Sequence, residues 1–155
     1  MINLSYQYEC KADAKGRIKL PTGLKTELAD VWNDGFIIKR STFGKCLEFY
    51  PSSVWNQELA KINKLNRYKA KNVRFMRSFL TGVKQANPDA NDRVLIPKEL
   101  MEVAGLSKEV VLAPLIDRLE IWDKKTYEEM IRSMSNEEYQ ELAEDVMQNI
   151  DPDQE

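Results

Sequence analysis

Histidine is absent from the 155 residues, and this absence narrows the chemistry open to the protein. It removes the commonest general base, the usual metal ligand, and the Ser-His and Cys-His pairs that activate nucleophiles. Cysteine is scarce as well: Cys10 and Cys46 lie far apart without metal or redox spacing, so we expect two reduced thiols. The sequence therefore predicts a protein that is not an enzyme and holds neither a metal nor a cofactor.

Long apolar runs are also missing. No stretch reaches the ~18 residues that a membrane span needs, and the N-terminus lacks the basic-then-apolar pattern of a signal peptide. The composition, 43% hydrophobic and 31% charged, is that of an ordinary soluble globular protein rather than a disordered chain. We expect a cytoplasmic protein without membrane contact, folded as one compact unit or two small fused halves.

Charge is segregated along the chain. Residues 1–116 carry 19 Lys/Arg against 12 Asp/Glu, whereas residues 117–155 carry 4 against 13. Between Lys61 and Lys84 lie eight basic residues and no acid. Two interpretations of this run stay open: a solvated helix face, or a surface that attracts a polyanion.

One module occurs twice. Asp13 to Pro21 matches Asp89 to Pro97 at an offset of 76, and the segment 46–50 matches 118–122 at an offset of 72. The order of the two blocks is the same in both copies. Self-similarity of this kind indicates an internal duplication.

Each copy predicts the same succession of elements. An alternating segment leads through a polar loop into a short strand, then a helix started by Pro21 or Pro97, then two β-rich runs joined by a hairpin turn. The alternating segments are 6–10 and 80–85, the β-rich runs are 36–39 with 46–50 and 110–113 with 118–122, and the turns fall at 43–44 and 116–117.

A single copy is too small to bury a stable core, but two copies can cover each other's strand edges. We expect an α+β fold in which both repeats form a shared small barrel about a pseudo-two-fold axis, with helices between and after them. Helices are predicted over 126–134 and 138–147, the latter opened by a capping box of Ser135 and Glu138. The predicted division is a first repeat at 1–52, a helical connector at 53–79, a second repeat at 80–123, and C-terminal helices with an acidic tail at 124–155.

The polar loops are the candidate site. Aspartate starts turns by accepting bonds from its own backbone, and Gly16 supplies a positive φ, so turn chemistry alone explains most of the first loop. It does not explain why arginine recurs at Arg17 and Arg93 when Asp92 has replaced the glycine. Guanidinium groups bind phosphate in a bidentate way and read base edges in the major groove. We expect the domain to bring together a cationic set at one edge: Lys11, Lys15, Arg17, Lys19 and Arg93.

An ordered set of motifs resembles the MraZ family, whose two repeats are of the AbrB-like swapped-hairpin kind. The motifs span roughly residues 1–135: Asp13-Ala14-Lys15-Gly16-Arg17 with Pro21, Gly44 to Leu47 with Tyr50-Pro51 and Trp55, Arg77 with Phe79-Leu80, Arg93 with Ile96-Pro97, and Asp117 to Trp122. The resemblance implies a cytoplasmic, nucleoid-associated transcription factor. It also implies ring-shaped homo-oligomers that bind double-stranded DNA at promoter direct repeats of the division and cell-wall gene cluster.

The resemblance places DNA binding on Lys15, Gly16 and Arg17 of the first loop and on Arg93 of the second. Asp92 stands where the family usually has glycine, so we expect the first loop to bind DNA more strongly than the second. An alternative function is an assembly module without specific DNA binding, in which the basic central helices dock acidic partners or the acidic tail of a neighbouring copy.

Overall fold

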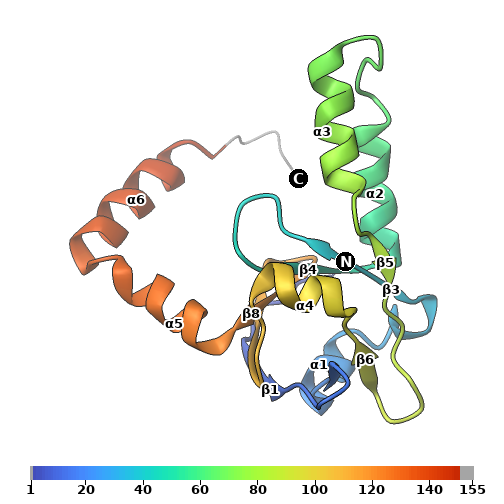
Figure 1. Ribbon diagram of the computed structural model, residues 1–155. Coiled ribbons are helices and arrows are strands. Elements are labelled where there is room, and N and C mark those ends of the chain that lie inside the picture. The colour runs from blue at the N-terminus through green and yellow to red at the C-terminus, as the bar shows by residue number, and fades with distance from the viewer. Residues whose placement is uncertain (1, 151–155) are drawn as a thin grey trace. The chain divides into compact units, whose positions relative to one another are not determined.

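The computed structural model describes residues 2–150 and divides into two compact units, residues 1–124 and 125–155. The strands lie in the first unit (Figure 1). Their bounds are β1 Tyr8–Lys11, β2 Arg17–Lys19, β3 Phe36–Arg40, β4 Leu47–Pro51, β5 Lys84–Gln85, β6 Arg93–Leu95, β7 Glu109–Pro114 and β8 Leu119–Asp123. The helices are α1 Thr22–Glu27, η1 Trp32–Asp34, α2 Ser52–Ile62, α3 Ala70–Leu80, α4 Lys98–Ala104, α5 Lys124–Ser133 and α6 Asn136–Gln148.

The two repeats exchange strands. Six strands form one antiparallel sheet in the order β1-β7-β8-β4-β3-β5. The counterparts of β1, β3 and β4 in the second repeat are β5, β7 and β8, so the strand order is symmetric about its centre. β1 pairs with β7 of the second repeat, and β5 pairs with β3 of the first. Each repeat thus covers an edge of the other's hairpin, and this confirms the expected α+β fold built from two repeats.

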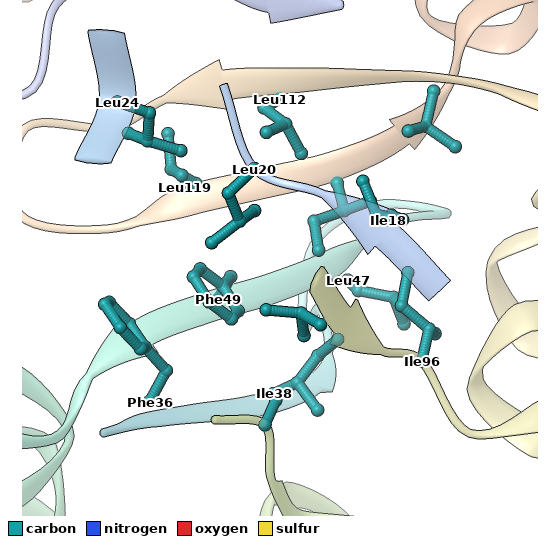
Figure 2. Packing of buried hydrophobic residues seen from close by; sticks show 14 of the residues in the cluster. Ile18, Leu20, Leu24, Phe36, Ile38, Leu47, Phe49, Ile96, Leu112 and Leu119 are labelled. Atoms are coloured by element: carbon teal, nitrogen blue, oxygen red, sulfur yellow. The ribbon is translucent and has the colours of Figure 1, made fainter. Parts of the chain in front are cut away.

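The second layer is a two-stranded ribbon. β2 and β6 pair antiparallel, with Arg17 opposite Leu95, Ile18 opposite Val94 and Lys19 opposite Arg93. The alternation along a strand turns Ile18 and Val94 inward, where both are buried. Figure 2 shows Ile18 and Ile96 lying over sheet residues such as Leu47, and the cluster draws on both repeats. The core therefore sits between the ribbon and the sheet.

The ribbon continues from both edges of the sheet. β1 leads through residues 12–16 into β2, and Ala12 forms a bridge with Ile18. The turns close in the same way, because Asp13 N donates to Arg17 O at 2.9 Å and Asp89 N donates to Arg93 O at 2.9 Å. These bonds favour the closed barrel, which stays a prediction.

The helices largely follow the sequence patterns. Pro21 and Pro97 directly precede α1 and α4, as expected, and these helices bury Leu24 and Leu100 at equivalent places. One expectation was wrong: the segment 80–85 is not one alternating strand. α3 runs to Leu80, and only Lys84–Gln85 pairs with β3, because the apolar face of α3 packs Phe79 against Trp55.

The C-terminal unit contains α6 and most of α5. The expected capping interaction is present, since Ser135 Oγ accepts a bond from Glu138 N at 3.1 Å. Among residues 2–150 no helix is both long and apolar enough to cross a membrane.

Candidate nucleic-acid interface

Both loops hold an arginine by the same set of bonds. Asp13 Oδ1 accepts from the backbone nitrogens of Lys15 and Arg17, each at 2.9 Å, and its Oδ2 accepts from Arg17 Nε at 2.7 Å. Asp89 repeats this with the backbone of Asn91 at 2.8 Å, the backbone of Arg93 at 3.0 Å, and Arg93 Nε at 3.1 Å. One carboxylate therefore shapes each turn and orients each guanidinium.

These bonds hold the aspartates in their charged form. The hydrogen bond from the backbone N–H of Arg17 is the main reason that the pKa of Asp13 lies below its ordinary value. The backbone N–H of Arg93 lowers the pKa of Asp89 in the same way. Both loops consequently stay braced at neutral pH, because the acceptor of each bond is a full carboxylate.

The bracing leaves part of each guanidinium available. Only Nε of Arg17 and of Arg93 is used, and within residues 2–150 their Nη1 and Nη2 atoms donate no hydrogen bond. The two side chains are 30% and 31% exposed. A guanidinium held by one nitrogen presents its outer edge in a fixed direction, which suits bidentate contact with a phosphate or a base.

The ribbon presents both arginines on its outer face. Since Ile18 and Val94 point inward, the alternation along β2 and β6 puts Arg17, Lys19, Arg93 and Leu95 outside. The arginines lie at opposite ends of this face, with Arg17 beside Leu95 and Arg93 beside Lys19. A two-stranded ribbon of this width fits the major groove of B-DNA.

The other predicted site residues lie around this face. Lys15 is exposed at the tip of the first turn, and Gly16 follows it with φ at +84°. Lys11 is the last residue of β1 and lies opposite Glu109. Because Ala12 bridges Ile18 in antiparallel register, Lys11 lies beside Lys19. The fold therefore gathers the predicted residues along one ribbon and its first turn rather than at a single point.

Lys25 is a residue of this region that sequence reasoning missed. Its Nζ lies 3.0 Å from Asp92 Oδ1 and 3.2 Å from Oδ2, so the acid beside Arg93 is already paired. At the repeat offset of 76 the counterpart of Lys25 is Met101, whose Cγ lies 3.9 Å from where a Cβ on Gly16 would be. Where the first loop has Gly16 the nearby residue is the uncharged Met101, and where the second loop has Asp92 the equivalent residue is Lys25. The charge of Lys25 thus compensates the charge of Asp92. Comparing the repeats position by position would have revealed this exchange.

The described residues offer little support for a metal site or a reactive cysteine. No group of three or more Cys, Asp or Glu residues there could hold a metal ion. Burial raises the pKa of the Cys10 thiol to about 12, and burial followed by the charge of Glu120 raises that of Cys46 to about 12. Both thiols are therefore protonated at neutral pH.

The exchanged strands and the paired Asp-x-x-x-Arg turns define a duplicated swapped-hairpin protein with a cationic ribbon. A sequence profile described as "MraZ protein, putative antitoxin-like" matches residues 4–78 and again residues 79–150, further than the motifs alone indicated. The chain belongs to the MraZ family.

Similar proteins carry the name of a regulator rather than of an enzyme. The chain is 50% identical to "Transcriptional regulator MraZ" of Christiangramia forsetii, over 99% of this chain and 98% of the relative. It is 45% identical to the protein of that name from Flavobacterium psychrophilum, over 95% and 93% of the two chains. The corresponding protein of Bacteroides thetaiotaomicron is 32% identical over 95% and 94%. These relatives agree with the expectation that the chain is not an enzyme.

Proposed function

We propose that the protein is a cytoplasmic DNA-binding transcriptional regulator that uses the outer face of the β2–β6 ribbon to bind duplex DNA. The observation that carries the proposal is the pair of aspartate-braced arginines, Arg17 and Arg93, at the two ends of that face. A structural role needs only the bond from Nε, yet both guanidinium groups keep their outer nitrogens available. The regulator name of the relatives supports the same interpretation.

The ligand is promoter DNA with repeated sites, in agreement with the sequence resemblance. Cations on one short ribbon neutralise few phosphates, so a single chain binds weakly and with a modest dependence on salt. Several chains that engage successive repeats gain affinity, because the second and later contacts become intramolecular. We therefore propose promoter direct repeats of the division and cell-wall gene cluster as the target, bound by an oligomer associated with the nucleoid.

Two surfaces support self-assembly. Helix α6 carries acids beside and opposite an exposed apolar stripe of Tyr139, Leu142 and Val146. The α2–α3 helical hairpin carries a groove of about 400 Å³ lined in part by Leu59, Met76 and Leu80. The exposed Arg67 lines the same groove and the exposed Arg77 lies one turn before Leu80 on α3, and neither makes an ion pair among residues 2–150. We infer that α6 of one copy docks its apolar stripe in this groove of another copy, where Glu138 and Asp145, which flank the stripe, face cations beside the groove.

The test of DNA binding is substitution of Arg17. Arg17→Ala should nearly abolish the mobility shift of a promoter fragment that carries the repeats. Arg17→Lys keeps the charge but loses the fixed fork, and we expect it to recover only part of the affinity. Lys125→Gln, which removes an exposed cation from the C-terminal unit, serves as the control. Unchanged affinity of Arg17→Ala, with circular dichroism showing an intact fold, would remove Arg17 from the site.

A further inference from the structure

The two ends of the ribbon are equivalent in backbone but not in chemistry. At one end Arg17 lies beside Leu95, and at the other Arg93 lies beside Lys19. The pseudo-two-fold axis relates Arg17 to Arg93 and Lys19 to Leu95, so the arginine is kept while its neighbour changes from a cation to an apolar side chain. A symmetric ribbon would have the same pair at both ends.

The residues that flank the ribbon also differ in charge between its two ends. The register of the Ala12–Ile18 bridge brings Lys11 to the level of Lys19. The counterpart of Lys11 in the second repeat is Asn87, whose Oδ1 accepts a hydrogen bond from Phe36 N at 3.0 Å. One end of the ribbon therefore gathers three cations, Lys11, Lys19 and Arg93. The other end has Arg17 next to the apolar Leu95, with Lys15 at the tip of the turn that leads into Arg17.

Leu95 is an exposed apolar side chain on the outer face of the ribbon. It is 55% exposed on a strand whose inward neighbour Val94 is 2% exposed, so it contributes little to the core. What distinguishes Leu95 from other exposed apolar residues is its place, beside Arg17 on the face that is proposed to bind DNA. In the major groove the apolar group on a base edge is the C5-methyl of thymine.

We propose that the two ends of the ribbon have different functions on DNA, with Leu95 beside Arg17 contacting a thymine methyl and Lys11 and Lys19 beside Arg93 contacting phosphates. The proposal rests on the proposed DNA binding and extends it. Phosphate contacts add affinity and salt dependence without sequence information, whereas contacts with base edges specify sequence. It follows that each chain binds a non-palindromic element, despite its pseudo-two-fold fold.

The first experiment uses the unmodified protein. Duplexes with a randomised centre are selected for binding and sequenced, and one non-palindromic element with a thymine toward one end is expected. Each thymine of that element is then replaced by uracil, which lacks only the methyl group. We expect a roughly 4-fold loss of affinity at one position, the effect of removing one buried methyl from an apolar interface. Enrichment of a palindrome, or no loss at any position, would overturn the proposal.

Substitutions assign the two functions to residues. Leu95→Ala should bind the thymine and uracil duplexes equally, while Val103→Ala, at an exposed apolar residue of α4, should still distinguish them. The double variant Lys11→Gln with Lys19→Gln should enrich the same element as the unmodified protein. Its slope of log affinity against log salt should fall by about 0.9 for each phosphate that the variant no longer neutralises. Retained discrimination in Leu95→Ala, or an altered element with an unchanged slope in the lysine variant, contradicts the division.

The outcomes distinguish a failure of this proposal from a failure of the proposed DNA binding on which it rests. If the unmodified protein enriches no duplex at all, DNA binding itself fails. If it enriches an element but the uracil and lysine results are absent, DNA binding stands and only the division of the ribbon is wrong.

Discussion

The residues that distinguish the two arginine loops are Gly16 and Asp92. Both take a positive φ, at +84° and +61°, to complete the turn before their arginine. A Cβ on Gly16 would lie 2.9 Å from Ile96 O, a carbonyl that is fixed in the backbone. Asp92 accommodates its Cβ in the left-handed region that aspartate tolerates, and Lys25 pairs its carboxylate. Equivalent turns therefore differ in their sensitivity to substitution.

Gly16→Ala should lower the free energy of unfolding by about 1–3 kcal/mol, because it adds strain at a positive φ and a close approach to backbone. Asp92→Gly should change it by less than about 1 kcal/mol, since relief of the positive φ offsets the loss of an exposed ion pair. Urea unfolding at pH 7 measures both values. Equal losses in the two variants would contradict this account of the turns.

The aspartates that brace the arginines predict a pH dependence. Because the pKa of Asp13 is lower in the folded chain than its ordinary value, its contribution to stability is present above that ordinary value. The contribution is lost as the pH falls through the lowered pKa. The stability difference between the unmodified protein and Asp13→Asn should therefore be constant from about pH 5 to 7 and shrink in more acidic solution. Urea unfolding across this pH range measures the difference. If the difference in free energy of unfolding grows on acidification, the charged form of Asp13 does not stabilise the fold.

At the scale of elements, Tyr50 connects parts of the chain that are distant in sequence. Its hydroxyl donates to a carboxylate oxygen of Glu48 and accepts from Arg118 Nη1 at 3.0 Å. Arg118 Nη2 also donates to Glu58 Oε1 at 2.9 Å, so the network joins β4, α2 and the turn before β8. Burial, followed by the bond to Glu48, raises the pKa of the Tyr50 phenol and keeps it protonated. The network therefore fixes α2 to the sheet.

Tyr50→Phe should destabilise the fold by roughly 1–3 kcal/mol, because Glu48 and Arg118 each lose a partner in a half-buried setting. Tyr68→Phe is the matched control, since Tyr68 is fully exposed, and it should lie within about 0.5 kcal/mol of the unmodified protein. Thermal or urea unfolding of the two variants compares them directly. A Tyr50→Phe protein as stable as the control would show that the hydroxyl network contributes nothing.

The elements themselves were largely predictable from the sequence, whereas their partners were not. The repeat of Asp, Arg and Pro at one offset predicts both turns, both short strands and the start of α1 and α4, because these depend on local chemistry. The exchange of β1 and β5 between repeats depends on which edge each strand meets after folding. Contacts such as Arg118 with Glu58 and Lys25 with Asp92 bridge 60 and 67 residues and have no local signature. For the site, the sequence indicated the cations, but only the strand register distinguishes the two ends of the ribbon.

At the scale of the whole molecule, the segregated charge acquires a structural meaning. Helix α6 carries acids beside and opposite its apolar stripe, and most of the basic run lies on the α2–α3 hairpin. A contact that combines apolar burial with opposite charges gains both affinity and orientation, and only its electrostatic part weakens with salt. Self-assembly through these two surfaces should therefore persist at moderate salt.

Charge exchange tests this assembly. Light scattering of the unmodified protein should give a mass several times the 18.0 kDa of one chain. Reversal beside the apolar stripe of α6, by Glu138→Lys with Asp145→Lys, should lower the mass, and so should reversal beside the groove, by Arg67→Glu with Arg77→Glu. Combining all four substitutions restores opposite charges across the interface and should recover the mass. Glu99→Lys with Glu102→Lys on α4 makes the same change of charge elsewhere and should leave assembly intact. A monomeric unmodified protein would exclude self-assembly, and a combined variant that stays small would exclude this pair of surfaces.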